Sequence, residues 1–381
     1  MSNTNKRIFL SPPFVGAAER AAVRGAFDSG YVAPCGPQVD EFERRLARLA
    51  GRKFAVAVSS GTAAIDLLMA ELGVDETWTV VAPTLTFIAT VGPAFHRGAK
   101  LVFVDSDATG NIDVSLLEEA LESLRVKLGS SRVGATLNDS KSTLKDSKIL
   151  VIGVDLYGNC CDYGAIAKLC RKFGAVFVTD AAEAVGATRV GRPAGSAGLA
   201  GVYSFNGNKI VTTSGGGAIV TDDRGLAERA RKRAQQSREK CVWYEHREVG
   251  YNYRLSNILA AIGLAQLGRL PAILKKRKAN YDWYARNFKG GLLSPTPGTN
   301  HWLTVAILSS RRERDKLLRR FEAADIEARP VWKPLHLQPV FAKCRVLGGE
   351  VAEALFERGV CLPSGTGLKS CDFDRIARCL E

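Results

Sequence analysis

The sequence lacks the features that mark membrane, zinc-binding and disulfide-stapled proteins. No uncharged apolar stretch approaches the roughly 18 residues of a membrane-spanning helix, and the first ten residues lack the apolar core of a signal peptide. The nine cysteines form no CxxC pair and the four histidines form no HxxxH pair. We therefore expect no membrane span, no metal site, free thiols and a cytoplasmic location.

Acidic residues are also in short supply. There are 39 of them against 53 lysines and arginines, which gives a formal net charge of +14. Such an excess favours anionic partners: nucleic acid, anionic lipid headgroups or phosphorylated small molecules. A solvated basic surface is the simpler interpretation of charge alone. The basic stretch at 224–240 carries no aromatic or recognition pattern, so we do not expect nucleic-acid binding.

The order of apolar and amphipathic segments predicts an α/β fold. Between residues 53 and 222, short apolar runs, such as 54–58 and 149–154, alternate with longer amphipathic stretches, one of which predicts a helix over 88–96. This alternation predicts a mostly parallel sheet that is covered by helices on both faces. Residues 128–148 interrupt the rhythm with a segment rich in Ser, Lys and Asp, which predicts a mobile surface insertion.

After residue 222 the pattern changes to long helices, at 224–240, 255–270 and 272–288, followed by a strand at 301–309. We expect a large domain over residues 1–265 and a smaller C-terminal α/β domain over residues 266–381. In this division residues 1–30 can pack on the smaller domain.

Residues 59–64 (SSGTAA) lie between a predicted strand and a predicted helix. Small residues let the backbone approach a ligand, and the free amides at a helix start suit an anion such as phosphate. Many strand-to-helix turns are rich in Gly and Ser for packing reasons alone. By itself this motif leaves both interpretations open.

Asp180 follows a predicted strand at 175–179. A carboxylate at the C-terminal end of a parallel strand lies where ligands bind in open α/β sheets. It could pair with a protonated ring nitrogen, and Glu183, three residues on, could face the same site. Capping of a helix by Asp180 is the alternative.

Lys209 is a lone lysine in an uncharged segment, and the small residues TTSGGG follow it at 212–217. A lysine shielded from water can form a Schiff base with a carbonyl group. In isolation, a surface lysine in a loop is the simpler interpretation. A phosphate cradle, an acid for a ring nitrogen and a Schiff-base lysine are, however, what pyridoxal phosphate requires together.

At this point the chain resembles a known family, the DegT/DnrJ/EryC1/StrS sugar-nucleotide aminotransferases of fold type I, which are aspartate aminotransferase-like. The resemblance covers nearly the whole length except the insertion. It rests on the motifs SSGTAAIDL, TLTFIAT, TDAAEAVG, YSFNGNKIVTTSGGG, GYNYRLSNILAAIGLAQL and RPVWKPLH. FLSPP, YVAPCGPQVDEFE and CLPSGT resemble the branch that aminates C4 of UDP-4-keto-6-deoxy-N-acetylglucosamine in bacterial glycan synthesis.

The resemblance implies roles for individual residues. Lys209 matches the lysine that holds pyridoxal phosphate and later shuttles a proton, and Asp180 matches the partner of the pyridine nitrogen. Glu183 lies where the family contacts the ring hydroxyl, and Phe87 matches the aromatic residue that stacks on the ring. The remaining cofactor-binding matches are Gly61, Thr62 and Ser204 at the phosphate, and Asn252, which the other subunit of a homodimer would supply.

Six further residues lie in segments that approach the sugar nucleotide in relatives: Tyr31, Arg254, Trp332, Lys333, His336 and Ser364. For His336 a structural loop histidine, and for Trp332 packing, are the alternatives. The chain has Ser214 where the family often has Glu before two glycines, a variant that occurs in the 4-aminating branch. It keeps Lys209, which disfavours the dehydratase relatives that replace this lysine with histidine.

The resemblance therefore implies a cytoplasmic homodimeric transaminase that takes its amino group from L-glutamate and passes it to C4 of a UDP-linked keto sugar. A C3 aminotransferase or a perosamine-type synthase acting on a dTDP- or GDP-keto sugar is the alternative enzyme. A non-catalytic regulator that binds pyridoxal phosphate is the alternative outside enzymes.

Overall fold

The computed structural model describes residues 6–129 and 148–381. Its largest feature is an eight-stranded sheet within these residues, in the order β1-β9-β8-β5-β4-β2-β3-β13. The strands from β8 to β13 pair in parallel, and β9 is antiparallel to both of its neighbours. In sheet order the strands are β1 (Phe54–Val58), β9 (Gly217–Thr221), β8 (Ala200–Ser204), β5 (Val176–Asp180), β4 (Ile149–Val154), β2 (Thr79–Pro83), β3 (Lys100–Val104) and β13 (Arg345–Leu347).

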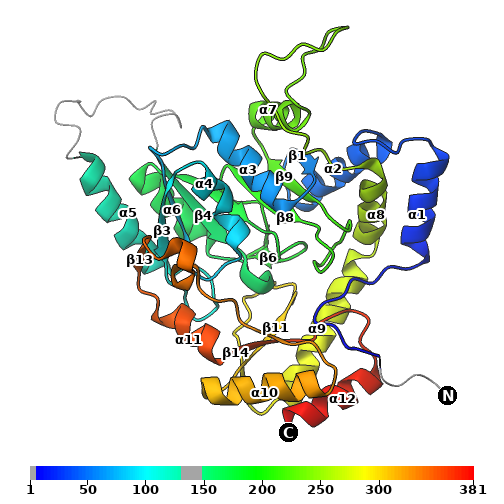
Figure 1. The fold of residues 1–381 in the computed structure, drawn as a ribbon, viewed down its shortest axis with the longest axis vertical. Coiled ribbons are helices and arrows are strands. Elements are labelled where there is room, and N and C mark those ends of the chain that lie inside the picture. Colours follow the sequence, from blue (N-terminus) through cyan, green and yellow to red (C-terminus); the bar gives the residue numbers. More distant parts are fainter. Residues whose placement is uncertain (1–5, 130–147) are drawn as a thin grey trace.

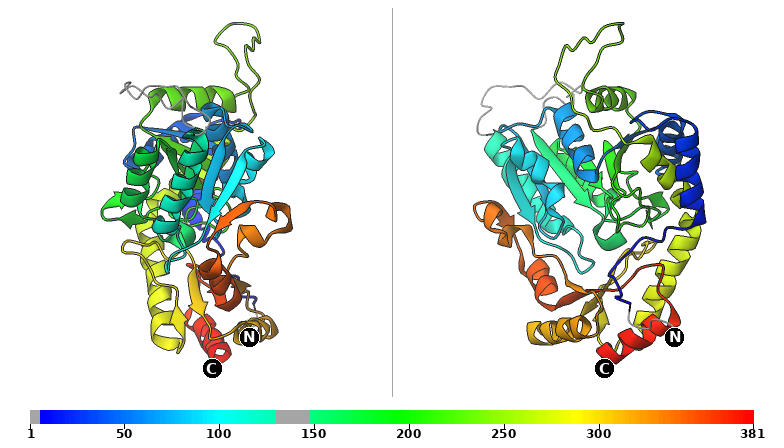
Figure 2. Two further views of the ribbon diagram at one scale, coloured as in Figure 1. Left: turned by 90° about the vertical axis from the view of Figure 1, so that its left-hand side faces the viewer. Right: turned by 45° about the vertical axis from the view of Figure 1, so that its right-hand side comes forward.

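Helices cover both faces of this sheet (Figures 1 and 2). One core cluster joins one face to α2 (Pro37–Leu49), α5 (Val114–Gly129), α6 (Tyr163–Phe173) and α8 (Asn257–Gly268). A second joins the other face to α3 (Gly61–Leu72), α4 (Gly92–His96) and α7 (Arg224–Ala234). The structure confirms the predicted α/β class with a mostly parallel sheet.

Strand and helix boundaries follow local chemistry. All six residues of β4 are buried, as expected for a central parallel strand that helices cover on both faces. The helix α3 begins where the Ser60 side chain accepts the Ala63 N–H, and it ends at Gly73 with φ 66°. A left-handed residue at this point stops the helix and turns the chain toward β2.

The C-terminal part builds a second sheet. It has four strands in the order β10-β11-β14-β12, all antiparallel. The strands are β10 (Gly291–Leu292), β11 (Thr304–Ile307), β14 (Gly359–Leu362) and β12 (Arg329–Pro330), and the helices nearby are α9 (Leu270–Asn287), α10 (Arg311–Ala323), α11 (Glu350–Arg358) and α12 (Ser370–Leu380). A third core cluster lies here. In Figure 1 the long helix α9 leads from the large sheet down to this layer.

Both ends of the chain connect the two sheets. Ile8 pairs with Ile326 in a parallel bridge near the small sheet, whereas α1 (Ala17–Asp28) packs on α8. The strand β13 comes from the C-terminal part, yet it extends the large sheet beside β3. The domain boundary near residue 265 stays a prediction.

Three predicted boundaries are wrong for identifiable reasons. The basic helix ends at Ala234 rather than residue 240, because Gln236 and Ser237 have positive φ angles. The strand expected from residue 301 begins at Thr304, since His301 has φ 51°. The helix expected over 88–96 divides into a 3-10 turn, η1 (Ile88–Thr90), and α4 with Pro93 in its first turn.

The predicted insertion at 128–148 lies, for residues 130–147, outside the described residues. No single helix in the described part is long and apolar enough to cross a membrane, and α8 with α9 meets that test only as a pair bent by 63°.

Candidate active site

A cavity of about 320 Å³ opens beside the C-terminal ends of β5 and β8 and the N-terminus of α3. This volume suits a small-molecule cofactor or substrate. Eight residues singled out from the sequence line it: Gly61, Thr62, Phe87, Asp180, Glu183, Ser204, Lys209 and Trp332.

Asp180 is the last residue of β5, and its carboxylate is buried. Oδ2 accepts a 2.8 Å hydrogen bond from the Thr90 hydroxyl, and Oδ1 accepts one of 3.1 Å from the Ala182 N–H. Burial raises the pKa of Asp180, although these donors and the nearby Lys209 act against the shift. Both hydrogen-bond donors are neutral, so the carboxylate suits a cationic ligand group such as a protonated ring nitrogen.

Lys209 lies in the segment between β8 and β9, and its Nζ is 3.3 Å from Oε1 of Glu183. The other carboxylate oxygen of Glu183 accepts a 2.7 Å hydrogen bond from the Tyr157 N–H. Burial raises the pKa of Glu183 to about 7, and the charge of Lys209 opposes that shift. The ammonium also lies 4.0 Å from the ring centroid of Trp302. The lysine is therefore held at the cavity wall.

The N-terminus of α3 forms another part of the wall. The Ser60 hydroxyl accepts the Ala63 N–H, which leaves the amides of Gly61 and Thr62 in the first turn beside the cavity. A Cβ on Gly217 would come within 2.4 Å of the Ser60 carbonyl carbon. The glycine therefore lets β9 approach this helix start closely. Amides at a positive helix end, with the hydroxyls of Thr62 and Ser204, suit a phosphate group.

Two of the residues that line the cavity, Phe87 and Trp332, are aromatic. Phe87 is 58% exposed although it lines the cavity, and its ring centroid lies 5.7 Å from that of Trp332. Trp332 also packs 5.1 Å from Tyr157. The open face of Phe87 is available for a flat ring.

The other predicted residues are not among those that line the cavity. Arg254 is buried in an ion pair of 2.6 Å with Glu43. Ser364 donates to the Leu362 carbonyl, and His336 contacts Thr84 and Glu353 through its two ring nitrogens. The side chains of Tyr31, Asn252 and Lys333 are exposed. The substrate roles of these residues stay predictions.

Asn252 lies in the chain between two tyrosines whose rings stack on each other. Tyr251 and Tyr253 lie 4.6 Å apart at 5°, on the same side of the extended chain. The Arg97 guanidinium donates a 3.0 Å hydrogen bond to the Tyr251 hydroxyl and one of 2.7 Å to the carboxylate of Asp66 in α3. Since side chains alternate along an extended chain, Asn252 points away from this cluster.

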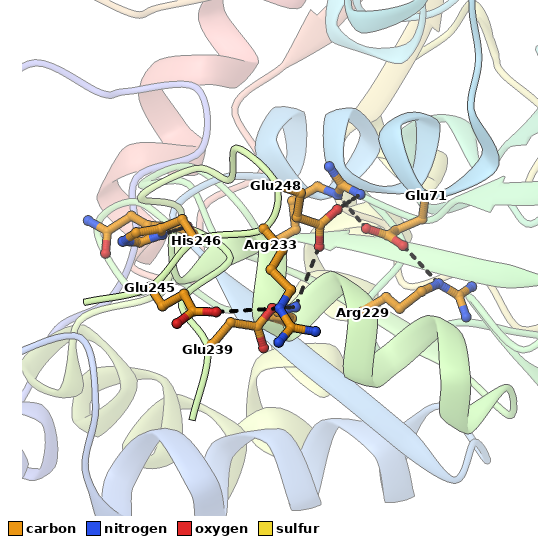
Figure 3. Close-up of polar contacts among 10 residues, drawn as sticks. Glu71, Arg229, Arg233, Glu239, Glu245, His246 and Glu248 are labelled. Atoms are coloured by element: carbon orange, nitrogen blue, oxygen red, sulfur yellow. Dashed lines mark hydrogen bonds and ion pairs between the residues drawn. The ribbon is translucent and has the colours of Figure 1, made fainter. Parts of the chain in front are cut away.

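An arm formed by residues 235–250 projects beyond α7 just before Asn252 (Figure 1). Glu71 of α3, whose side chain is 2% exposed, forms ion pairs with Arg229 and Arg233 of α7 (Figure 3). Arg233 also pairs with Glu248 of the arm at 2.9 Å. These contacts fix the base of the arm to the helix whose N-terminus lines the cavity.

Sequence reasoning missed three residues that hold the site. Thr90 lies in the same TLTFIAT motif as Phe87, three residues on, so the spacing of one helical turn was an available signal. Tyr157 and Trp302 come from segments with no local signal, because their contacts to Glu183 and Lys209 form only in the folded chain. In the described residues, no group of three or more His, Cys, Asp or Glu could hold a metal ion.

The arrangement has what pyridoxal phosphate needs in its binding site. It combines an amine for the aldehyde, a buried carboxylate for the ring nitrogen, an aromatic face, and a helix start for the phosphate. The residues therefore fit this cofactor.

Comparisons with known proteins agree with the geometry. A model of the DegT/DnrJ/EryC1/StrS aminotransferase family matches residues 13–381. The chain is 39% identical to EpsN of Bacillus subtilis, whose name describes a pyridoxal phosphate-dependent aminotransferase, over 99% of this chain and 95% of that one. It is 34% identical to the GDP-perosamine synthase of Caulobacter vibrioides over 98% of both chains. It is also 34% identical to the UDP-4-amino-4,6-dideoxy-N-acetyl-beta-L-altrosamine transaminase of Campylobacter jejuni, over 67% of this chain and 62% of that one.

Solved structures share the fold. TlmJ, an aminotransferase from Streptoalloteichus hindustanus, superposes with a TM-score of 0.84 at 29% identity, and 97% of each chain is covered. Spr1654 of Streptococcus pneumoniae, named as a sugar aminotransferase and solved in a PLP-form, gives 0.84 at 26% identity over 98% of each chain. The chain belongs to the DegT/DnrJ/EryC1/StrS aminotransferase family and is a pyridoxal phosphate-dependent sugar aminotransferase of fold type I.

Proposed function

We propose that this enzyme moves the amino group of L-glutamate to C4 of a nucleotide-linked 4-keto-6-deoxy sugar. The substrate we propose is UDP-4-keto-6-deoxy-N-acetylglucosamine, which would give UDP-4-amino-4,6-dideoxy-N-acetylglucosamine. One observation supports this most: Lys209, Asp180 and the start of α3 converge on one cavity large enough for a cofactor. The similarity to a transaminase named for a UDP-linked sugar supports the nucleotide.

In the proposed site each side chain has a distinct task. Asp180 binds the ring nitrogen, Phe87 stacks on the ring, and Gly61, Thr62 and Ser204 hold the phosphate. Bound pyridoxal phosphate supplies an electron-withdrawing ring that stabilises negative charge at the reacting carbon. Glu183 orients Nζ of Lys209, which takes the proton from the carbon of the amino donor and returns one to C4 of the acceptor.

We further propose a cytoplasmic homodimer with shared sites, in which Asn252 of one subunit reaches the cofactor phosphate in the other. The direction of its side chain, away from the stacked rings of Tyr251 and Tyr253, supports this role. The sugar nucleotide would then enter near Trp332, which borders the cavity. Tyr31, Arg254, Lys333, His336 and Ser364 remain the proposed substrate-side residues.

A second candidate substrate has its own support. The GDP-perosamine synthases of three bacteria are 31–34% identical to this chain over at least 96% of its length. Purified enzyme supplied with L-glutamate and, separately, UDP-, GDP- and dTDP-linked 4-keto-6-deoxy sugars distinguishes the candidates. We expect the highest kcat/KM with the UDP-linked N-acetylated sugar. A preference for the GDP-linked sugar would favour a perosamine-type synthase instead.

A further inference from the structure

Trp302 makes two contacts that converge on the lysine at the cavity wall. Its indole ring lies with its centroid 4.0 Å from the Lys209 ammonium. Its Nε1–H donates a 2.8 Å hydrogen bond to the carbonyl oxygen of Asn208, the residue before the lysine. Since Trp302 is only 2% exposed, both contacts lie in a part of the site that is shielded from water.

Trp302 is itself held from two directions. Its backbone N–H donates 2.9 Å to Oδ1 of Asn300. The Asn300 side-chain amide donates 2.9 Å to the carbonyl oxygen of Glu183, the residue that pairs with Lys209. One asparagine thus fixes the distance between the two groups that flank the lysine.

The second brace is the buried guanidinium of Arg277 in α9. It donates a 2.9 Å hydrogen bond to the Trp302 carbonyl oxygen and one of 3.0 Å to the Ser11 hydroxyl. Ser11 in turn donates 2.9 Å to the same Asn208 carbonyl that Trp302 binds. A guanidinium is a rigid fork of donors, so both routes to Asn208 share one anchor.

We infer that Trp302 is a positioning residue for Lys209, which holds Nζ between the indole face and Glu183 and fixes the backbone on the N-terminal side of the lysine. This inference rests on the proposed role of Lys209. A desolvated cation over an indole face is stabilised more than an exposed one, so the contact favours one location of the ammonium. Proton transfer depends steeply on such placement.

The test compares Trp302→Leu, Trp302→Phe and Trp78→Leu. Trp78 is a buried tryptophan, 3% exposed, that does not line the cavity in the described chain, so it controls for the loss of a core indole. The first readout is the rate at which pyridoxal phosphate becomes attached covalently to the apoenzyme, trapped with borohydride. The second is the half-reaction with L-glutamate and with 2-deuterated glutamate.

We expect Trp302→Leu to slow both attachment and the half-reaction about tenfold, with KM for glutamate unchanged and a larger deuterium isotope effect. Trp302→Phe keeps an aromatic face and should lie within about threefold of wild type. Trp78→Leu should change melting temperature only. Wild-type rates and isotope effect in Trp302→Leu, or the same losses in Trp78→Leu, would overturn the inference.

Lys209→Ala separates this inference from the proposed function on which it rests. If Lys209→Ala still attached the cofactor covalently, the proposed role of the lysine would fail, and the positioning role of Trp302 with it. If Lys209→Ala does not attach the cofactor covalently while Trp302→Leu behaves as wild type, only the proposed role of Trp302 is wrong.

Discussion

The Thr90 hydroxyl donates a 2.8 Å hydrogen bond to Oδ2 of Asp180, and both side chains are buried. The contact joins the turn that carries Phe87 to the end of β5. It fixes the acid for the cofactor nitrogen relative to the aromatic residue proposed to stack on the ring. Each of the two residues can therefore be tested separately.

Asp180→Asn should reduce the half-reaction with glutamate by roughly 100-fold or more, because the ring nitrogen loses the charge that keeps it protonated. Thr90→Val removes one hydrogen bond to that carboxylate but leaves its charge in place, so it should slow the half-reaction by only up to about tenfold. Single-turnover absorbance measurements after glutamate addition check both. Equal losses in the two variants would contradict the assignment of the acid.

Mixed dimers test whether Asn252 acts across the subunits. Lys209→Ala and Asn252→Ala are each expected to be inactive or strongly impaired alone. In a mixed dimer one of the two sites would combine an intact lysine with an intact asparagine, so random mixing of the two variants should recover about a quarter of wild-type activity. Without recovery, Asn252 would have to act within its own chain.

Asp155 should make the stability of the apoenzyme depend on pH. Burial raises the pKa of this carboxyl group from its ordinary value near 4 to about 7, despite hydrogen bonds from the Tyr163 hydroxyl and the Cys161 N–H. Between about pH 4 and 7 the folded state thus keeps a proton that the unfolded chain releases. The stabilising contribution is complete below pH 4 and is lost as pH rises through 7.

Asp155→Asn removes this titrating group. Between about pH 4 and 7 the free energy of unfolding of the variant should therefore fall by roughly 2–4 kcal/mol less than that of wild type. Urea denaturation at several pH values measures it. The control is Asp222→Asn, since the Arg52 ion pair and the Lys53 N–H outweigh partial burial and lower the pKa of that carboxyl group. The stability that Asp222 contributes is lost only as pH falls below about 4. In Asp222→Asn the free energy of unfolding should therefore change with pH above 4.5 as it does in wild type. Identical slopes for wild type and Asp155→Asn would contradict the shifted pKa.

The sequence predicts those parts of the fold and site that depend on local chemistry. The strands β1 and β4 and the start of α3 can be predicted from the sequence. A buried strand appears as a short apolar run, and a capped helix begins at a typical capping residue. Asp180 and Lys209 are found for the same reason, since Asp180 is the last residue of β5 and Lys209 comes shortly after β8.

Features that depend on distant contacts could not be predicted in this way. Trp302 contacts Lys209, which lies 93 residues earlier in the chain. The strand β13 pairs with β3 although their partners Arg345 and Val102 lie 243 residues apart. The early end of α7 could not be predicted, because Gln236 and Ser237 adopt a left-handed backbone that the sequence usually marks with a glycine. Such features arise from tertiary packing, which overrides local preference.

The most direct test follows the absorbance of the purified enzyme with pyridoxal phosphate through both halves of the reaction. L-Glutamate alone should convert the cofactor band to that of its amine form, and UDP-4-keto-6-deoxy-N-acetylglucosamine should restore it with formation of the 4-amino sugar. Lys209→Ala should show neither change. A wild-type enzyme whose spectrum does not respond to glutamate, or a Lys209→Ala variant that completes the cycle, would contradict the account.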